Sequence, residues 1–296
     1  MKIINIDKKN WDEGVQKARQ SYKLIGPVRD GMFHLFKELD KNEMPDMLYK
    51  TSRLSPKEVV FPRSESILEY NLDENSDDYG IPKEIEKDNS PKAVIGIRPY
   101  DAKAIQLTKL NFDTEEHKDV YWLNAYESTT FVGLAVNEPS SVDFFFFFCI
   151  CLFDEAGLDL LLIDNGENYF AKVITDKGAK FLDSAGFNKE VVNDEKEKAI
   201  EKINHLKEKA ESSIKSEVSF DKIKDKTVLE IYDADFWDDL SFGCINCGTC
   251  TFCCPTCWCF DLQDEKVNSK KSVRNKNWDS CMFSLFTKHS SSHNPR

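Results

Sequence analysis

The first 148 of the 296 residues contain no cysteine, and the chain as a whole has fewer basic than acidic residues. Lys and Arg number 40 against 52 Asp and Glu, which gives a formal net charge of −12. Without a positive face to neutralise phosphates, binding to nucleic acid or to an anionic membrane surface is not expected. Other proteins are the more natural partners.

Long apolar runs are also lacking. The amino-terminal residues have no apolar signal-peptide core, and the longest run, Phe144 to Phe153, is too short to span a bilayer. We therefore expect a cytoplasmic protein with no direct membrane span. Five consecutive phenylalanines within that run, Phe144–Phe148, would promote aggregation if exposed, so we expect them to be buried or docked on a partner.

Glycine is scarce, and neither a G-x-G-x-x-G nor a Walker pattern occurs, so no nucleotide-binding loop is predicted. Short apolar runs at 93–97, 131–136, 158–163 and 169–174 predict buried strands, the last two joined by a tight turn at 164–166. Asp101 is a candidate N-cap for a helix over 102–110. These patterns predict an α+β protein whose residues 1–187 form a mixed α/β domain.

Charge dominates the next part of the chain. Apolar residues at helical spacing within 189–217 predict one long helix with a narrow apolar stripe lying on the first domain. We assign 188–226 as a charged helix and linker. Residues 227–296 are expected to form a small, mostly helical, ferredoxin-like 4Fe-4S domain.

Eight of the ten cysteines fall between 244 and 281. In a reducing cytosol such clustered cysteines are more often metal ligands than disulfides. Cys244, Cys247, Cys250 and Cys254, followed by proline, form a C-x2-C-x2-C-x3-C-P motif, in which three sulfurs can reach three corners of one [4Fe–4S] cube. In two-cluster ferredoxins the fourth cysteine of this run ligates the other cluster. Cys254 is therefore a ligand of this cube or of its neighbour, so one or two clusters are predicted.

Further cysteines exceed the needs of one cluster. Cys257, Cys259 and Cys281 are candidate additional ligands, whereas Cys253 is interpreted as a packing thiol beside Phe252. Cys149 and Cys151 are better explained as core residues than as a metal site, because two thiolates do not complete one. Nearby aromatic residues would give the clusters a dry surrounding that tunes their potential: Trp258, Phe260, Trp278 and Phe283.

Two other classes of protein remain open on these residues. A zinc-stabilised structural or adaptor protein would use the same cysteines for folding, although structural zinc sites usually pair two C-x2-4-C knuckles across a spacer. An iron–sulfur redox sensor would change its partner binding when it loses the cluster. His289 and His293, in a polar serine-rich stretch, are interpreted as surface residues rather than ligands.

The cysteine region resembles the iron–sulfur β subunit of cytoplasmic sulfhydrogenases and the A subunit of anaerobic sulfite reductase. The match includes 244–261, Trp278-Asp-Ser-Cys281 and His293-Asn-Pro-Arg296. It continues upstream through Ala234–Asp239, Gly31–Phe36, Leu54-Ser-Pro-Lys-Glu58 and Gly96–Asp101. The resemblance implies an electron-transfer subunit with no substrate site of its own. Such a subunit relays single electrons between a flavin- or NAD(P)H-handling subunit and a catalytic subunit, a hydrogenase or sulfite reductase.

Three features depart from this family. A second C-x2-C-x2-C-x3-C-P usually follows the His-Asn-Pro-Arg segment, so either the sequence is truncated at Arg296 or Cys257, Cys259 and Cys281 complete the ligand set. Tyr100 and Val136 stand where relatives often carry cysteine. With these two residues in place, the additional amino-terminal cluster that the resemblance implies is not expected here.

Overall fold

The computed structural model describes residues 2–140, 151–214, 219 and 221–295. Its centre is a seven-stranded sheet in the order β1-β9-β8-β7-β6-β2-β3. Strands β2, β6, β7 and β8 run parallel to one another, while β1, β9 and β3 join as antiparallel strands at the two sides of the sheet. The bounds of these strands are β1 Lys2–Asp7, β2 Lys23–Asp30, β3 Phe33–Glu38, β6 Lys92–Ile97, β7 Thr129–Leu134, β8 Leu160–Asp164 and β9 Asn168–Val173.

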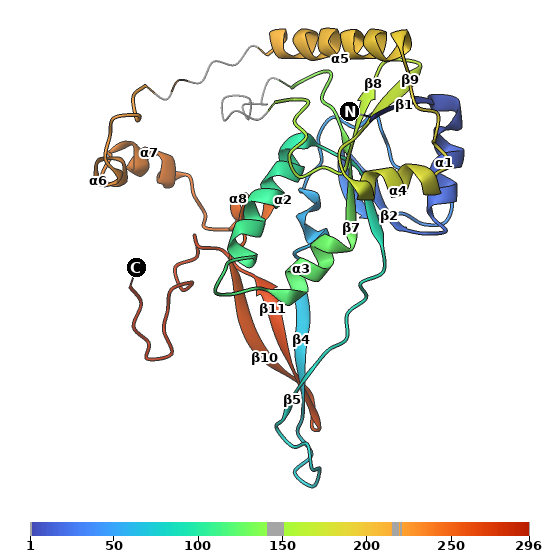
Figure 1. The fold of residues 1–296 in the computed structure, drawn as a ribbon. Coiled ribbons are helices and arrows are strands. Elements are labelled where there is room, and N and C mark those ends of the chain that lie inside the picture. Colours follow the sequence, from blue (N-terminus) through green and yellow to red (C-terminus); the bar gives the residue numbers. More distant parts are fainter. Residues whose placement is uncertain (1, 141–150, 215–218, 220, 296) are drawn as a thin grey trace.

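Helices cover both faces of this sheet (Figure 1). On one face, apolar residues of α2, α3 and α5 pack with alternate strand residues such as Val94 and Phe131. On the other, α1 and α4 pack with the intervening strand residues, including Ile95 and Val132. This alternation follows from the two-residue period of a strand. The helices span α1 Trp11–Ala18, α2 Pro99–Phe112, α3 Val120–Glu127, α4 Asp176–Ser184 and α5 Asp194–Ser212.

The strands expected at 93–97, 131–136, 158–163 and 169–174 are confirmed as β6, β7, β8 and β9, and β8 and β9 form the expected hairpin. The helix expected over 102–110 is longer. Asp101 is not its N-cap: Arg98 occupies that position and Asp101 lies in the first turn. Pro99 explains the earlier start, because its fixed φ suits the first helical position and its missing N–H is not needed there.

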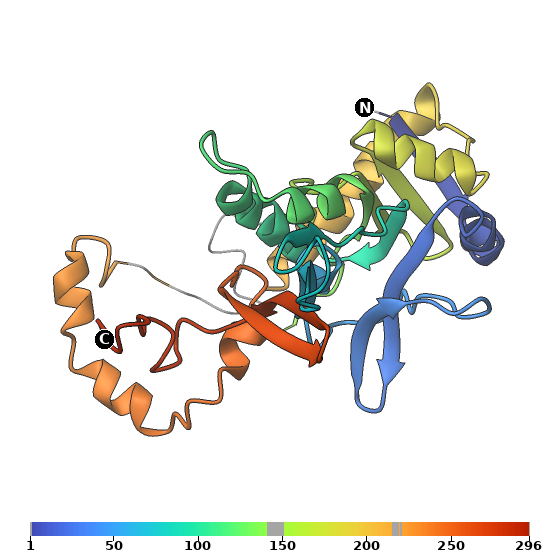
Figure 2. The same cartoon turned by 90° about the horizontal axis from the view of Figure 1, so that it is seen from below.

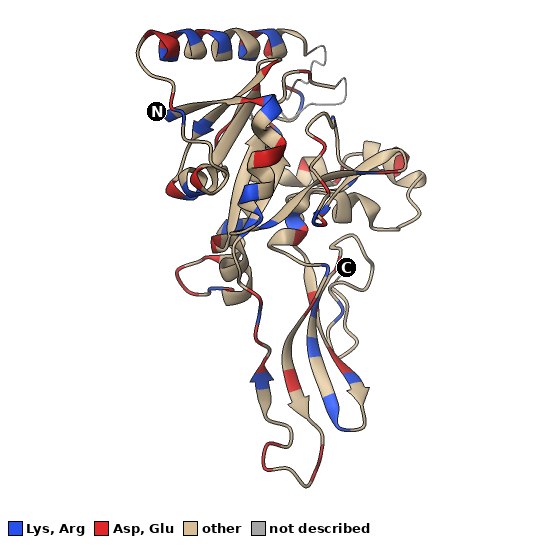
Figure 3. Ribbon diagram, turned by 90° about the vertical axis from the view of Figure 1, so that its right-hand side faces the viewer, with Lys and Arg blue, Asp and Glu red and all other residues tan. Residues whose placement is uncertain are grey.

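The long charged helix is confirmed as α5, which lies on the sheet domain through its apolar stripe. Ala199 and Ala210 are buried, and Ile203 and Leu206 pack against the core. Figure 3 shows both acidic and basic residues along the length of this helix. The segments Phe144–Phe148 and Cys149 lie outside the described residues.

A second sheet has the order β10-β11-β4-β5 (Figure 1). It combines β4 Ser64–Asn71 and β5 Pro82–Glu84, from the first part of the chain, with β10 Phe260–Asn268 and β11 Lys271–Trp278. β11 pairs antiparallel with β4. The cysteine segment is thereby joined to residues about two hundred positions earlier.

Three short helices lead up to β10: α6 Val228–Tyr232, α7 Phe236–Phe242 and α8 Thr249–Cys253. They form an arc beside the carboxyl-terminal residues (Figure 2). The α+β class is confirmed. The mostly helical, ferredoxin-like form of residues 227–296 is not, because two long strands accompany these helices. Two 3-10 turns complete the elements, η1 Lys8–Asn10 and η2 Pro56–Val59. Among the described residues, no helix combines the length and apolar character needed to cross a membrane.

Candidate metal centre

The first two cysteines of the motif lie on an exposed turn between α7 and α8, and the third lies in the first turn of α8. Cys244, Cys247 and Cys250 are all solvent-exposed. Gly248, with φ of +69°, begins α8 in the left-handed region, and a Cβ at this position would lie 2.6 Å from the Phe283 ring. Glycine is therefore required here both by conformation and by space.

A threonine hydroxyl accompanies two of the motif thiols. The Cys247 Sγ lies 3.2 Å from the Thr249 hydroxyl and the Cys254 Sγ lies 3.1 Å from that of Thr256. The hydroxyl and then the amide of Thr249 lower the pKa of Cys247. Burial raises the pKa of Cys254, but hydrogen bonds from Thr256 and Cys257 outweigh it and lower the pKa overall. Both sites therefore favour thiolate, the form that binds metal.

The later cysteines are half-buried and interact in pairs. Cys257 hydrogen-bonds to Cys254, and burial together with this bond raises the pKa of Cys257. Cys259 and Cys281 form the second pair. Burial raises the pKa of Cys259; a backbone hydrogen bond from Cys281 opposes this shift, and the Cys281 thiol adds to it. The Asp279 amide donates to the Cys259 carbonyl at 3.0 Å, which brings the two chain segments together.

A hydroxyl pair ties Cys281 to helix α8. The Thr251 hydroxyl donates to the Gly248 carbonyl at 2.7 Å and lies 2.9 Å from the Ser280 hydroxyl. Ser280 is fully buried. Beside it, Trp278 stacks on Phe252 and on Phe61 of the first sheet domain. Trp278 therefore links the cysteine segment to the amino-terminal part of the chain, whereas Trp258, also expected beside the clusters, is 40% exposed.

The structure also shows two residue types that the sequence reasoning missed. Lys57, in η2, donates to the carbonyls of Cys254 and Cys257 at 2.8 and 3.0 Å. Burial lowers its pKa, whereas the thiols of Cys257 and Cys254 act in the opposite direction. The two threonines could have been found from the sequence, since each stands two residues after a motif cysteine. For Lys57 the only sequence indication was its position in the segment Leu54-Ser-Pro-Lys-Glu58.

Cys151 lies elsewhere, beside the last turn of α5. Its thiol donates to Glu211 at 3.0 Å, and burial together with this carboxylate raises the pKa of Cys151. Tyr100 and Val136 belong to the same apolar core cluster. These three residues therefore pack as core in the described part of the chain. His289 and His293 are exposed near the carboxyl-terminal end of the chain.

Within the described ranges, no group of three or more Cys, His, Asp or Glu side chains is arranged to hold a metal ion. The donor set still fits a 4Fe–4S cluster in its chemistry. The ligand candidates are all thiols, two of them carry hydrogen bonds that favour thiolate, and Gly248 lets the backbone approach closely.

Residues 243–296 match the family model described as a 4Fe-4S dicluster domain. The cysteine-rich part of the chain therefore defines an iron–sulfur protein of the electron-transfer class, with 4Fe–4S clusters as its cofactor. At the level of the whole chain, similarity extends to sulfhydrogenase 2 subunit beta of Pyrococcus furiosus. The two are 21% identical over 290 residues, which cover 96% of this chain and 80% of that relative. The resemblance to iron–sulfur β subunits is thus confirmed. No solved structure matches the chain.

Proposed function

We propose that this protein is the electron-transfer subunit of a soluble, cytoplasmic multi-subunit oxidoreductase. It relays single electrons between a flavin- or NAD(P)H-handling subunit and a catalytic subunit such as a hydrogenase or sulfite reductase. The observation that carries this proposal is the gathering of seven candidate thiol ligands in a 4Fe-4S dicluster domain, three of them exposed to an approaching partner. When bound, the clusters supply one-electron storage.

The cavities support a carrier rather than an enzyme with its own substrate. Cavities of about 440 and 450 Å³ lie beside Tyr121 and beside Asn168, and neither is lined by a cysteine. The cavity that Cys257 does line holds about 10 Å³, roughly the space of one water. A substrate molecule has no room beside that thiol.

The surface around the exposed thiols favours a basic partner. No Lys or Arg occurs between residues 227 and 265, whereas α6 and α7 and their connection carry several acidic residues. The same helices expose large apolar side chains, among them Phe242 and Leu229. We expect the partner subunit to cover this surface.

For the ligands, we propose that Cys244, Cys247 and Cys250 hold one cube. Cys254, Cys257, Cys259 and Cys281 are proposed for the second. Support comes from the different burial of the two sets and from the pairing of Cys254 with Cys257 and of Cys259 with Cys281. The division into domains at 187 and 226 stays a prediction.

Anaerobic purification tests this function. We expect a brown protein with about four irons and four acid-labile sulfides per cluster and an EPR signal on reduction. A colourless protein with stoichiometric zinc would establish the structural alternative instead. A redox sensor would release its partner reversibly on oxidation, whereas an electron-transfer subunit stays bound through turnover.

A further inference from the structure

Lys57 is a buried lysine that reaches the cysteine segment from the first part of the chain. Its exposed fraction is 4%, and its ammonium nitrogen donates to the carbonyls of Cys254 and Cys257 at 2.8 and 3.0 Å. The same nitrogen lies 4.4 Å from the centre of the Trp278 ring. The contacts fix a positive charge at the base of the 254–257 turn.

The positive charge of Lys57 differs from that of other buried lysines in the groups that surround it. In the described part of the chain, no carboxylate lies within ion-pair distance of it, whereas the equally buried Lys276 is paired with Asp119 at 2.5 Å. A buried cation without an anion is costly. The two residues whose carbonyls it binds, Cys254 and Cys257, carry thiols that become negatively charged when they ligate iron. The ammonium group of Lys57 therefore lies where negative charge develops when the cysteine ligands bind iron.

We propose that Lys57 is a positioning residue of the iron–sulfur site, which holds the 254–257 turn and favours the reduced state of the cluster bound there. One-electron reduction adds one negative charge without making or breaking a covalent bond. A fixed positive charge close by stabilises that added charge. This inference rests on the proposed function, because it requires that Cys254 and Cys257 ligate a cluster.

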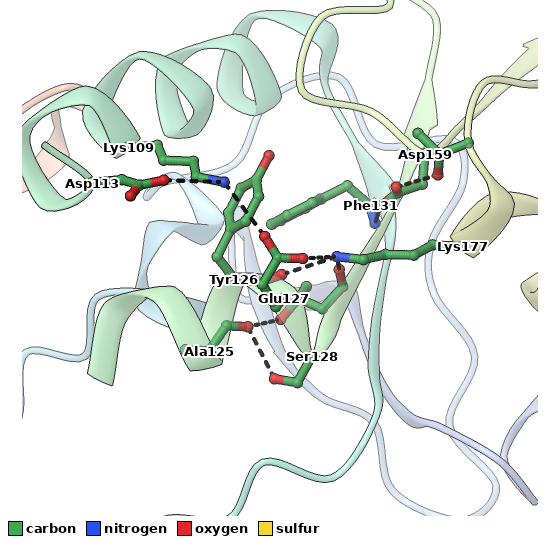
Figure 4. Close-up of polar contacts among 11 residues, drawn as sticks. Lys109, Asp113, Ala125, Tyr126, Glu127, Ser128, Phe131, Asp159 and Lys177 are labelled. Atoms are coloured by element: carbon green, nitrogen blue, oxygen red, sulfur yellow. Dashed lines mark hydrogen bonds and ion pairs between the residues drawn. The ribbon is translucent and has the colours of Figure 1, made fainter. Parts of the chain in front are cut away.

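Lys177, in α4, supplies a control at a site that contains no cysteine. Its ammonium nitrogen lies 3.4 and 3.3 Å from the carbonyls of Tyr126 and Thr129 and 5.5 Å from the Tyr126 ring centre (Figure 4). It thus makes the same kinds of contact as Lys57, next to Glu127 instead of thiols. Removing its charge tests the loss of a carbonyl-binding lysine without touching the cysteines.

The experiment uses the full chain, purified anaerobically, as wild type and as the variants Lys57→Met, Lys57→Arg and Lys177→Met. Iron and sulfide are counted, and the midpoint potential of each EPR signal is measured by redox titration. We expect Lys57→Met to shift one signal to a more negative potential at unchanged iron content. Lys57→Arg keeps the charge and should stay near the wild-type potential, as should Lys177→Met.

A wild-type potential in Lys57→Met with full iron content would overturn the inference, and so would an equal shift in Lys177→Met. If Lys57→Met loses iron, anaerobic reconstitution is repeated beside Lys57→Arg. Retention of iron only in the arginine variant supports the positioning role, whereas equal loss in both contradicts it. Absence of iron from the wild type is a different result, because it rejects the proposed function itself.

Discussion

Apolar side chains are buried in the central sheet but exposed in the segment that leads to the cysteines. In the sheet, Ile95 is fully buried and Phe131 is 2% exposed, whereas Val228 and Phe242 before the first cysteine are 83% and 94% exposed. Helices α6 and α7 have only five and seven residues, too few to be stable without packing. The sheet is therefore held by its own core. We expect the segment around α6–α8 to gain its order from bound clusters and partner subunits.

Replacing a cysteine ligand should have the largest effect, and that effect should be confined to the cysteine segment. We expect Cys247→Ser to lose one cluster, about four irons, while the sheet keeps its protection from hydrogen exchange. Cys253→Ser is the matched control, because Cys253 is interpreted as a packing thiol and should leave the iron content unchanged. Iron analysis and peptide-resolved hydrogen exchange check both. Equal iron loss in the two variants would show that Cys253 is also a ligand.

The next largest effect is expected from truncating one large aromatic side chain in each of the two regions. Phe131→Ala should cost about 3–5 kcal/mol of unfolding free energy, because it empties a buried site in the sheet core. Trp278 is only half-buried, so Trp278→Ala should cost less, about 2 kcal/mol, but it also removes the stack on Phe252 beside the cysteines. Denaturant unfolding followed by circular dichroism, with iron analysis, separates the effects. Iron loss in Phe131→Ala alone would contradict the division between the regions.

The sequence predicted best what depends on neighbouring residues. Strands β6 to β9 are buried apolar runs bounded by turns, and α5 has an apolar stripe, so local patterns were sufficient. Asp101 was misplaced at the helix start because Pro99 provides a stronger signal. The α+β class followed from these elements.

Contacts between distant parts of the chain could not be predicted in the same way. Strand β10 is almost entirely exposed and has four charged residues among its nine, so no buried apolar face marks it, and its sheet depends on β11 pairing with β4. The contact of Lys57 with Cys254 spans 197 residues. At the candidate site, the cysteine motif gave the type of ligand and cofactor, while the pairing of Cys259 with Cys281 required the fold.

A pH effect should arise in the sheet region from one buried carboxyl group, that of Asp101. Burial raises the pKa of Asp101 to about 6, although the nearby Ser55 hydroxyl and the charge of Arg98 oppose the shift. Between about pH 4 and 6 the folded state keeps the proton that the unfolded state releases. Stability should therefore be full below pH 4, fall by up to about 3 kcal/mol as pH rises through this window, and change little from this group above it. In Asp101→Asn the fall should disappear. Denaturant unfolding from pH 4 to 7 measures it, and parallel profiles for the two proteins would reject this assignment.

The smallest expected effect compares two glycines that share a left-handed backbone. Gly31, with φ of +59°, has open space around a Cβ, whereas at Gly248 a Cβ would contact the Phe283 ring. Gly31→Ala should cost about 1 kcal/mol from backbone strain alone, and Gly248→Ala about 2 kcal/mol because the ring must also move. Since Phe283 packs on Phe252 beside the motif, only Gly248→Ala should slow cluster reconstitution. Unfolding and reconstitution rates test this, and similar rates for both variants would mean that the Gly248 turn is not part of the iron–sulfur site.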